Sequence, residues 1–345
     1  MIKKILSPTV GLMIFALVAI IGFAYVKWVP YYTKAHFAQT NHFIGDSILS
    51  GKSATVPPTS LKAAADYAIA YGMSIWKALV LGLILGSGIK VLLPNGWVNA
   101  ALGRMGFRSI ALGSFLSLPC MMCTCCAAPV AAGLRQSRAS VGSAVSWWIF
   151  NPVLNPATLV FMGFVLGWGW TLFRIVFGLA MVLAVAYLAE RFAGKQEVVS
   201  LEHAIPPEAE LPKGNLLVRW GRELMTLSIR LVPEYLLLVL LLGATRAWLF
   251  PVLDAHDSIG WIMAMALAGT LFVIPTAGEV PIVQAMLALG MGVGPAAALI
   301  MTLPAVSLPS LAMLGSVFSL RTRLVIFAGV ALSGIAAGLI AMNVF

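Results

Sequence analysis

The feature that most constrains this chain is a series of long apolar runs separated by short polar stretches. An α-helix needs about 20 apolar residues to cross the hydrocarbon core of a bilayer, and nine runs exceed 20 residues. They are 8–28, 67–93, 109–134, 139–166, 169–189, 224–250, 259–289, 293–318 and 324–344. Because a helix satisfies its backbone groups within lipid, the sequence predicts an all-α polytopic membrane protein.

The composition excludes a soluble domain, and the distribution of charge indicates how the chain is oriented in the membrane. Hydrophobic residues make up 61% of the chain and charged residues 10%, whereas about a quarter of a soluble domain is charged. The net charge of +10 comes from short basic clusters between the apolar runs, a pattern that orients membrane proteins. We therefore expect the lipid bilayer, and no nucleic acid, as a partner. No small-residue cleavage site follows the first run, which indicates a retained span and not a signal peptide.

A polar stretch near the middle of the chain separates two similar halves. The predicted segments are an N-terminal span with an external loop (1–66), a first repeat (67–193), a cytoplasmic linker (194–221) and a second repeat (222–345). A shift of 152 residues superposes Pro129 on Pro281 and Pro152 on Pro304. Chance is the alternative, because glycine and proline are frequent in membrane helices. The matched apolar contexts favour duplication.

The arginines provide a test of topology. Nine crossings would place basic clusters on both faces, against the positive-inside tendency. If 109–134 and 259–289 each enter and leave on one face, the clusters around Arg104, Arg138 and Arg222 all become cytoplasmic. Re-entrant backbone is tolerated where protein or a wet cavity surrounds it. We therefore predict seven full spans plus two re-entrant hairpins, in two inverted repeats whose broken helices meet near mid-membrane. Nine spans are the alternative.

All the cysteines lie in the first hairpin, within the stretch PCMMCTCC. They are Cys120, Cys123, Cys125 and Cys126. Because proline breaks helices, we expect Pro119 and Pro129 to bracket a non-helical tip. Sulfur is a soft ligand that suits Cu(I) and zinc, and the same softness suits trivalent arsenic. Close thiols at a helix break predict a substrate-binding site, whose thiolates need a nearby positive group or helix N-terminus.

The thiols also fit three roles that involve no transported solute. A free cysteine can simply pack as a small hydrophobe. A structural zinc site would need all its ligands from one tight loop, because the sequence has no second cluster of Cys or His. A disulfide could join Cys120 to Cys123 or Cys125. We expect no cofactor, and the sequence identifies no particular metal.

Three further polar residues are candidates for the substrate site. Asn151 and Asn155 each precede a proline at a second break, where they could bind a polar ligand or cap a helix. Glu279 lies in PTAGEVP, the matching tip of the second half. A carboxylate within the membrane is a functional candidate by default. We expect Glu279 to bind substrate and couple proton movement to transport, with backbone capping or pairing with Lys77 as the alternative.

Three motifs carry a family resemblance. They are Cys123-Thr124-Cys125-Cys126-Ala127-Ala128-Pro129, Asn151-Pro152-Val153-Leu154-Asn155-Pro156 and Gly278-Glu279-Val280-Pro281. The chain, over roughly 67–345, resembles the bacterial predicted-permease family that includes the trivalent organoarsenical efflux permease ArsP. Members commonly have glycine where this chain has Cys126. The resemblance implies permease activity in the inner membrane and, for some members, export of organoarsenicals.

These observations predict a multi-pass permease of the bacterial inner membrane, and not an enzyme. Its solute would be small and thiophilic, with efflux of trivalent (organo)arsenicals favoured and a soft metal ion or sulfur compound as alternatives. A membrane thiol-disulfide oxidoreductase is an alternative of another class, because Cys120 and Cys123 have C-x-x-C spacing, but no thioredoxin-like pattern accompanies them. A non-transporting scaffold subunit is a further alternative. The sequence leaves open whether the chain forms a homo-oligomer.

Overall fold

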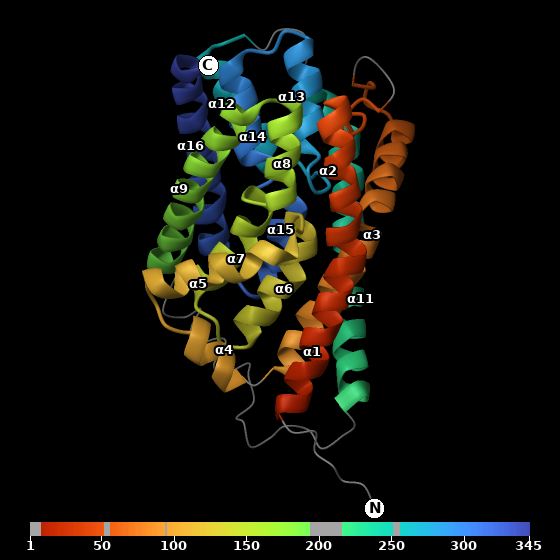
Figure 1. The fold of residues 1–345 in the computed structure, drawn as a ribbon, viewed down its shortest axis with the longest axis vertical. Helices are drawn as coiled ribbons and strands as arrows, with labels where there is room; N and C mark the ends of the chain where they lie inside the picture. Colours follow the sequence, from red (N-terminus) through yellow and green to blue (C-terminus); the bar gives the residue numbers. More distant parts are fainter. Residues whose placement is uncertain (1–7, 52–55, 94, 194–215, 251–255) are drawn as a thin grey trace, which may run out of the picture.

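The computed structural model is built of helices and has no β-strand among the residues it describes (Figure 1). Those residues are 8–51, 56–93, 95–193, 216–250 and 256–345. Within them, six helical segments are long and apolar enough to cross a membrane. They are Gly11–Asn41, Leu61–Leu92, Val141–Val165, Trp168–Phe192, Leu217–Leu249 and Leu320–Val344. The predicted all-α, multi-pass membrane class is therefore confirmed by helix length and hydropathy.

The first helical rod is longer than the sequence suggested. It consists of α1 (Pro8–Phe23), a π-helical turn η1 (Ala24–Trp28) and α2 (Val29–Asn41). We expected the span to end at Trp28 and a loop to begin at Pro30. The helix continues through Pro30, which lies just after the π-helical turn, because one proline removes only a single helical hydrogen bond. The rod packs along α3 (Leu61–Leu92).

The first half continues with a short helix, two helices within the predicted hairpin 109–134, a helix interrupted at Leu154 and an unbroken helix. These are α4 (Asn95–Leu102), α5 (Phe107–Ser117), the 3-10 turn η2 (Leu118–Cys120), α6 (Thr124–Gln136), α7 (Val141–Val153), α8 (Pro156–Val165) and α9 (Trp168–Phe192). After a long helix, the described part of the second half has the same order without a counterpart of α4. It comprises α11 (Leu216–Leu249), α12 (Ile259–Leu271), α13 (Glu279–Ala288), α14 (Val293–Thr302), α15 (Leu308–Met313), η4 (Leu314–Ser316) and α16 (Leu320–Val344).

Contacts between helices recur in the two halves. In the first half, α5 packs on α7 and α9, and α7 also packs on α6 and α9. In the second half, α12 packs on α14 and α16, and α14 also packs on α13 and α16. The halves meet where α3 packs on α11, α9 on α16 and α6 on α15. In Figure 1, α12 and α13 lie toward the end that carries the C-terminus, while α4 and α6 lie toward the opposite end.

The helix breaks lie at capping residues and at a left-handed residue more often than at the prolines. Pro129 does not end a helix as we expected, since it lies inside α6, which begins at Thr124. One internal proline removes a single helical hydrogen bond, and α6 continues through it. The break lies instead at Met121, which has a left-handed φ of 50°. Two further breaks are capped by side chains, with Asn155 at the start of α8 and Ser307 at the start of α15.

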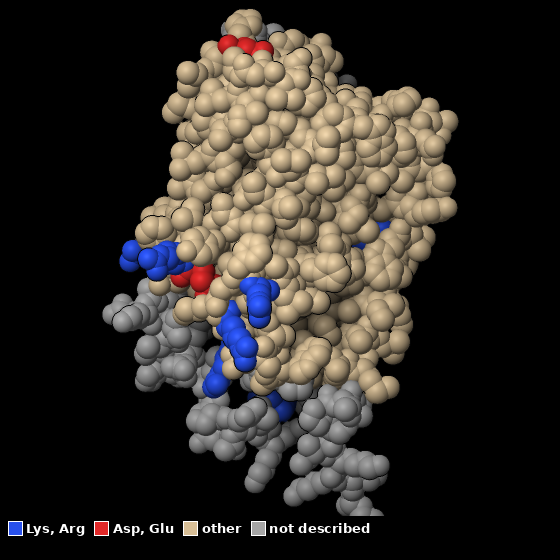
Figure 2. All heavy atoms as spheres, turned by 60° about the vertical axis from the view of Figure 1, so that its left-hand side comes forward, with Lys and Arg blue, Asp and Glu red and all other residues tan. Residues whose placement is uncertain are grey.

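The charged side chains are distributed unevenly along the long axis. On the face drawn in Figure 2, most Lys and Arg side chains lie toward the lower end, and the upper tip shows acidic side chains. Basic residues occur at the start of α5, between α6 and α7, at the end of α9 and at the start of α16. They are Arg104, Arg108, Arg138, Arg191, Arg321 and Arg323. One end of the bundle is therefore markedly basic.

Candidate functional site

The tip of the first hairpin is held in a non-helical conformation by two long side chains. The indole of Trp28 donates a hydrogen bond to the carbonyl of Pro119 at 2.8 Å. The side-chain oxygen of Asn151 accepts from the backbone N–H of Met122, also at 2.8 Å. Backbone groups at a break must find partners inside the protein when no water reaches them. Trp28 and Asn151 supply two of those partners and fix the start of α6.

Two of the thiols touch each other at the start of α6. All four cysteines are free and buried. Cys123 precedes the first helical residue and Cys126 lies one turn later, with 3.0 Å between their Sγ atoms. This pair, Cys123 and Cys126, is called the thiol pair below. The disulfides considered from sequence, between Cys120 and Cys123 or Cys125, are absent from the structure.

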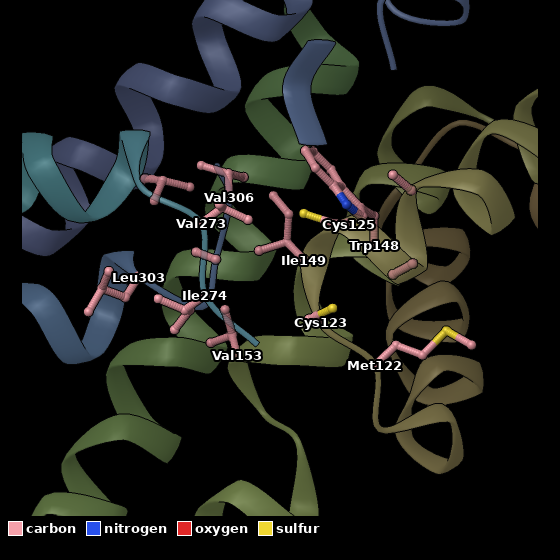
Figure 3. Packing of buried hydrophobic residues seen from close by; sticks show 14 of the residues in the cluster. Met122, Cys123, Cys125, Trp148, Ile149, Val153, Val273, Ile274, Leu303 and Val306 are labelled. Atoms are coloured by element: carbon pink, nitrogen blue, oxygen red, sulfur yellow. The ribbon is translucent and has the colours of Figure 1, made fainter. Parts of the chain in front are cut away.

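The remaining two cysteines have separate surroundings. The Cys125 Sγ lies 3.7 Å from the hydroxyl of Ser307, which belongs to the second half. The Cys120 thiol faces its own helix, 3.9 Å from the carbonyl of Leu116. Figure 3 shows Cys123 and Cys125 on one segment close to Ile149, while Met122 points away from them. The four thiols therefore have three kinds of surroundings. Cys123 and Cys126 contact each other, Cys125 contacts Ser307 of the second half, and Cys120 contacts neither.

Lys27, a buried lysine of the N-terminal rod, lies near the thiol pair. Lys27 is 4% exposed. Its Nζ donates hydrogen bonds to the hydroxyls of Tyr31 and Thr276, both at 3.0 Å. Its charge interacts with both thiols of the pair, and the Thr276 hydroxyl interacts with Cys123. Lys27 is thus a residue of the candidate site that the sequence analysis did not single out.

The tip of the second hairpin carries a buried ion pair. Glu279 begins α13, and its Oε1 lies 2.7 Å from Nη1 of Arg174 on α9, with both side chains at most 1% exposed. Arg174 also donates to the carbonyls of Val153 at 2.7 Å and Pro152 at 3.0 Å. These carbonyls lie in the last turn of α7, where helix carbonyls lack intrahelical partners. One guanidinium therefore connects α7, α9 and α13.

Glu279 does not pair with Lys77, which was one of the alternatives. Lys77 lies over the rings of Tyr25 and Trp76, at 5.4 and 5.7 Å. The sequence did contain a signal for Arg174, because it is an arginine inside the apolar run 169–189. Charged residues inside a membrane helix mark functional or paired positions. Its partner could not be deduced, because the two residues come from different halves.

Two cavities meet at the tip of the second hairpin. The outer one measures about 350 Å³ and is lined by Lys34, Asp46 and the stretch from Pro275 to Gly278, among others. The inner one is close to 10 Å³ and is lined by Cys123, Glu279 and the same tip, which is about the space one water molecule needs. Pro275, Thr276 and Ala277 line both cavities. The hairpin tip therefore separates the outer cavity from the thiol pair.

The two asparagines use their oxygen atoms for backbone contacts. Asn151 accepts from Met122, as described above, and Asn155 caps α8 by accepting from the backbone N–H groups of Ala157 and Thr158. Both side chains are buried, and their amide nitrogens have no hydrogen-bond partner in the described part of the chain. Each asparagine therefore shapes a break while keeping donors to spare.

Further groups near the thiols are polar but uncharged. The hydroxyl of Tyr235 donates to that of Tyr71 at 2.6 Å, and both interact with Cys125. Neither tyrosine was singled out from the sequence. Within the described ranges, no three His, Cys, Asp or Glu side chains are grouped to hold a metal ion. The arrangement is therefore suited to a solute that binds two sulfurs, and it lacks the donor set of a structural zinc site.

The fold and site together define a multi-pass membrane protein built around broken helices. The chain belongs to the predicted permease family ArsP_1, which matches residues 9–153 and 60–343. It is 51% identical to the UPF0718 protein YraQ of Escherichia coli K12 over 333 residues, covering 95% of this chain and 94% of that protein. It is 21% identical to the UPF0718 protein MJ0584 of Methanocaldococcus jannaschii over 322 residues, covering 73% of this chain and 87% of that protein. No solved structure matches the chain. The family resemblance noted in the sequence is confirmed.

Proposed function

We propose that this permease moves a small thiophilic solute, most simply a trivalent organoarsenical, by binding it at Cys123 and Cys126. The observation that carries the proposal is the 3.0 Å separation of the two sulfurs at a helix break. A trivalent arsenical can bond to both sulfurs at once. Such bonds are strong but exchange with other thiols and with water, so the solute can be captured on one side and released on the other.

The proposed architecture is two inverted repeats with seven crossings and two re-entrant hairpins. Several features support it. The same helix contacts recur in both halves. The seventh crossing would be the broken pair α14 and α15, each too short to span alone. Paired broken helices in the two halves of a transporter are where its solute binds.

The proposed orientation places the basic end of the bundle in the cytoplasm, and we propose the bacterial inner membrane as its location. Positive loops stay inside, and the hairpin that carries the thiols enters from that end. The hairpin with Glu279 enters from the other end. Its tip separates the thiol pair from the outer cavity, so movement of this tip would open the site outward.

Transport by the thiol pair is tested with everted membrane vesicles, which expose the cytoplasmic end to the medium. Wild-type vesicles should accumulate phenylarsine oxide, measured as arsenic content, and vesicles with Cys123→Ser plus Cys126→Ser should not. Serine keeps the size but replaces a soft donor with a hard one. Equal arsenic accumulation in both vesicle types would overturn the proposal. Accumulation of Cu(I) or thiosulfate in place of arsenic would assign the thiol pair to the alternative solutes.

Proton coupling through Glu279 is proposed as a part of the same cycle. The carboxylate is committed to Arg174 in this structure, so coupling requires that the ion pair opens when the hairpin tip moves. Glu279→Gln should leave arsenical binding intact while abolishing accumulation driven by an imposed pH gradient. A variant that still accumulates arsenic with an unchanged dependence on the gradient would assign Glu279 a purely structural role.

A further inference from the structure

Lys27 is a buried cation without a carboxylate partner in the described part of the chain. The ion pairs there are Lys62–Asp66, Lys90–Glu223 and Arg174–Glu279. Lys27 is instead held between two neutral hydroxyls. Burying an unpaired charge costs several kcal/mol, so buried charges in proteins are paired. The amine therefore either loses its proton or faces a group that carries a negative charge.

The thiol pair is the group in position to supply that charge. Lys27 donates to the hydroxyls of Tyr31 and Thr276. Thr276 and Cys123 line the same inner cavity, and Cys126 is in contact with Cys123. Of these, a thiol loses its proton more readily than a tyrosine or threonine hydroxyl. Both cysteines lie at the N-terminus of α6, and the partial positive charge of a helix N-terminus also favours a thiolate. The ammonium group of Lys27 and the N-terminus of α6 thus both favour the thiolate form of the same two cysteines.

We infer that Lys27 is the counter-ion of a thiolate shared by Cys123 and Cys126, and that the site takes a neutral arsenic(III) compound with exchangeable hydroxyl groups. The thiolate and the ammonium cancel, so the resting site is neutral and can be buried in the membrane. A neutral solute then enters without leaving an unbalanced charge. The identity of the solute rests on the proposed function, whereas the pairing of Lys27 with the thiols does not.

The binding reaction balances without any further reactant. In phenylarsonous acid, the hydrated form of phenylarsine oxide, arsenic carries two hydroxyl groups. The thiolate forms a bond to arsenic as one As–O bond breaks, and Lys27 donates its proton to the departing hydroxide, which leaves as water. The second thiol then forms the other S–As bond, and its own proton leaves with the second hydroxide. Arsenic stays trivalent, and Lys27 remains as a neutral amine that can accept from the hydroxyls of Tyr31 and Thr276.

The rate of thiol alkylation tests the pairing directly. Purified protein is treated with iodoacetamide at neutral pH, and the modified cysteine is identified by peptide mass. Thiolates react and thiols do not, so we expect Lys27→Gln to slow alkylation of the thiol pair by at least about tenfold. Glutamine can keep the hydrogen bonds to Tyr31 and Thr276 while removing the charge. Lys27→Arg should restore the rate to within a few-fold, and Lys77→Met, which changes another lysine of the membrane region, should leave it unchanged.

Equal alkylation rates in wild type and Lys27→Gln, whether fast or slow, would overturn the inference, as would a failure of Lys27→Arg to restore the rate. A measurement on the wild type alone guards against a variant that does not fold. The native protein should lose thiolate absorbance near 240 nm on alkylation, and a native spectrum without that absorbance would contradict the pairing. If alkylation follows the charge at position 27 while everted vesicles accumulate no arsenic, the pairing stands and the proposed solute fails.

Discussion

The tips of the two predicted hairpins, which precede α6 and α13, carry different chemistry. The tip before α6 presents sulfur, with Cys123 and Cys126 in contact with each other. The tip before α13 presents Glu279, which is paired with Arg174. Sulfur bonds can be formed and broken with a solute, whereas a fully buried ion pair fixes the elements it joins. The segment before α6 thus offers two sulfurs in contact with each other, and the segment before α13 holds α7, α9 and α13 together through an ion pair.

This difference predicts opposite consequences for changes at the two tips. Removing one partner of a buried ion pair leaves an uncompensated charge, which costs about 3–5 kcal/mol. Replacing a thiol by a hydroxyl of similar size removes a soft ligand and changes packing little. Substitutions at the second tip should therefore act on stability and on the proposed proton coupling, and those at the first tip on binding.

The largest effect is expected for Arg174→Met, because it leaves Glu279 buried without a counter-charge and removes the donors to Pro152 and Val153. The variant should lose about 3–5 kcal/mol of stability, seen as a lower thermal midpoint and poor yield of monodisperse protein. Adding Glu279→Leu should recover part of the loss, since the buried charge is then removed. A single variant as stable as wild type would show that the ion pair does not hold the second tip.

The next effect concerns binding alone. The double variant Cys123→Ser, Cys126→Ser should bind phenylarsine oxide about 100-fold more weakly, equivalent to about 2.7 kcal/mol, with a thermal midpoint close to that of wild type. Titration of the purified protein followed by arsenic analysis measures this. Cys120→Ser is the matched control, because that thiol faces its own helix, and it should bind as wild type does. Weakened binding in Cys120→Ser equal to that in the double variant would remove the distinction between the pair and its neighbour.

A smaller effect is expected where α3 supports the first tip. A Cβ placed on Gly82 would collide with the backbone oxygen of Cys126, whereas one on Gly72 would meet no atom within 4 Å. Overpacking costs about 1–3 kcal/mol, so Gly82→Ala should lower the thermal midpoint and weaken arsenical binding. Gly72→Ala, in the same helix, should do neither. Equal behaviour of the two variants would mean that α6 does not depend on this close approach.

Local features of the fold were predictable, because apolar length and helix-breaking residues act within a short stretch of chain. The break within the cysteine stretch and the break capped by Asn155 follow from such signals, although Cys125 and Cys126 lie inside α6. The helical continuation through Pro30 and the placement of Pro129 inside α6 did not, because proline is tolerated at some helical positions and the sequence alone does not say which.

The partners within the site were not predictable, because they come from distant parts of the chain. Lys27 lies in the N-terminal rod, outside the stretch that carried the family resemblance, yet it bonds to Thr276. Arg174 and Glu279 belong to different halves. Lys27 and Arg174 are charged residues within apolar runs, which marks them as candidates for a functional or paired position. Only the packing of the rod and the two halves shows which groups these charges face.

The central claim, that Cys123 and Cys126 together bind the solute, is tested most directly by X-ray absorption at the arsenic edge. Purified wild-type protein loaded with phenylarsine oxide should show arsenic bonded to carbon and to two sulfurs, and the spectrum should be unchanged in Cys120→Ser. Cys126→Ser should leave at most one sulfur neighbour. Arsenic bonded to oxygen alone in the wild type, or two sulfur neighbours retained in the Cys123→Ser, Cys126→Ser double variant, would contradict the account.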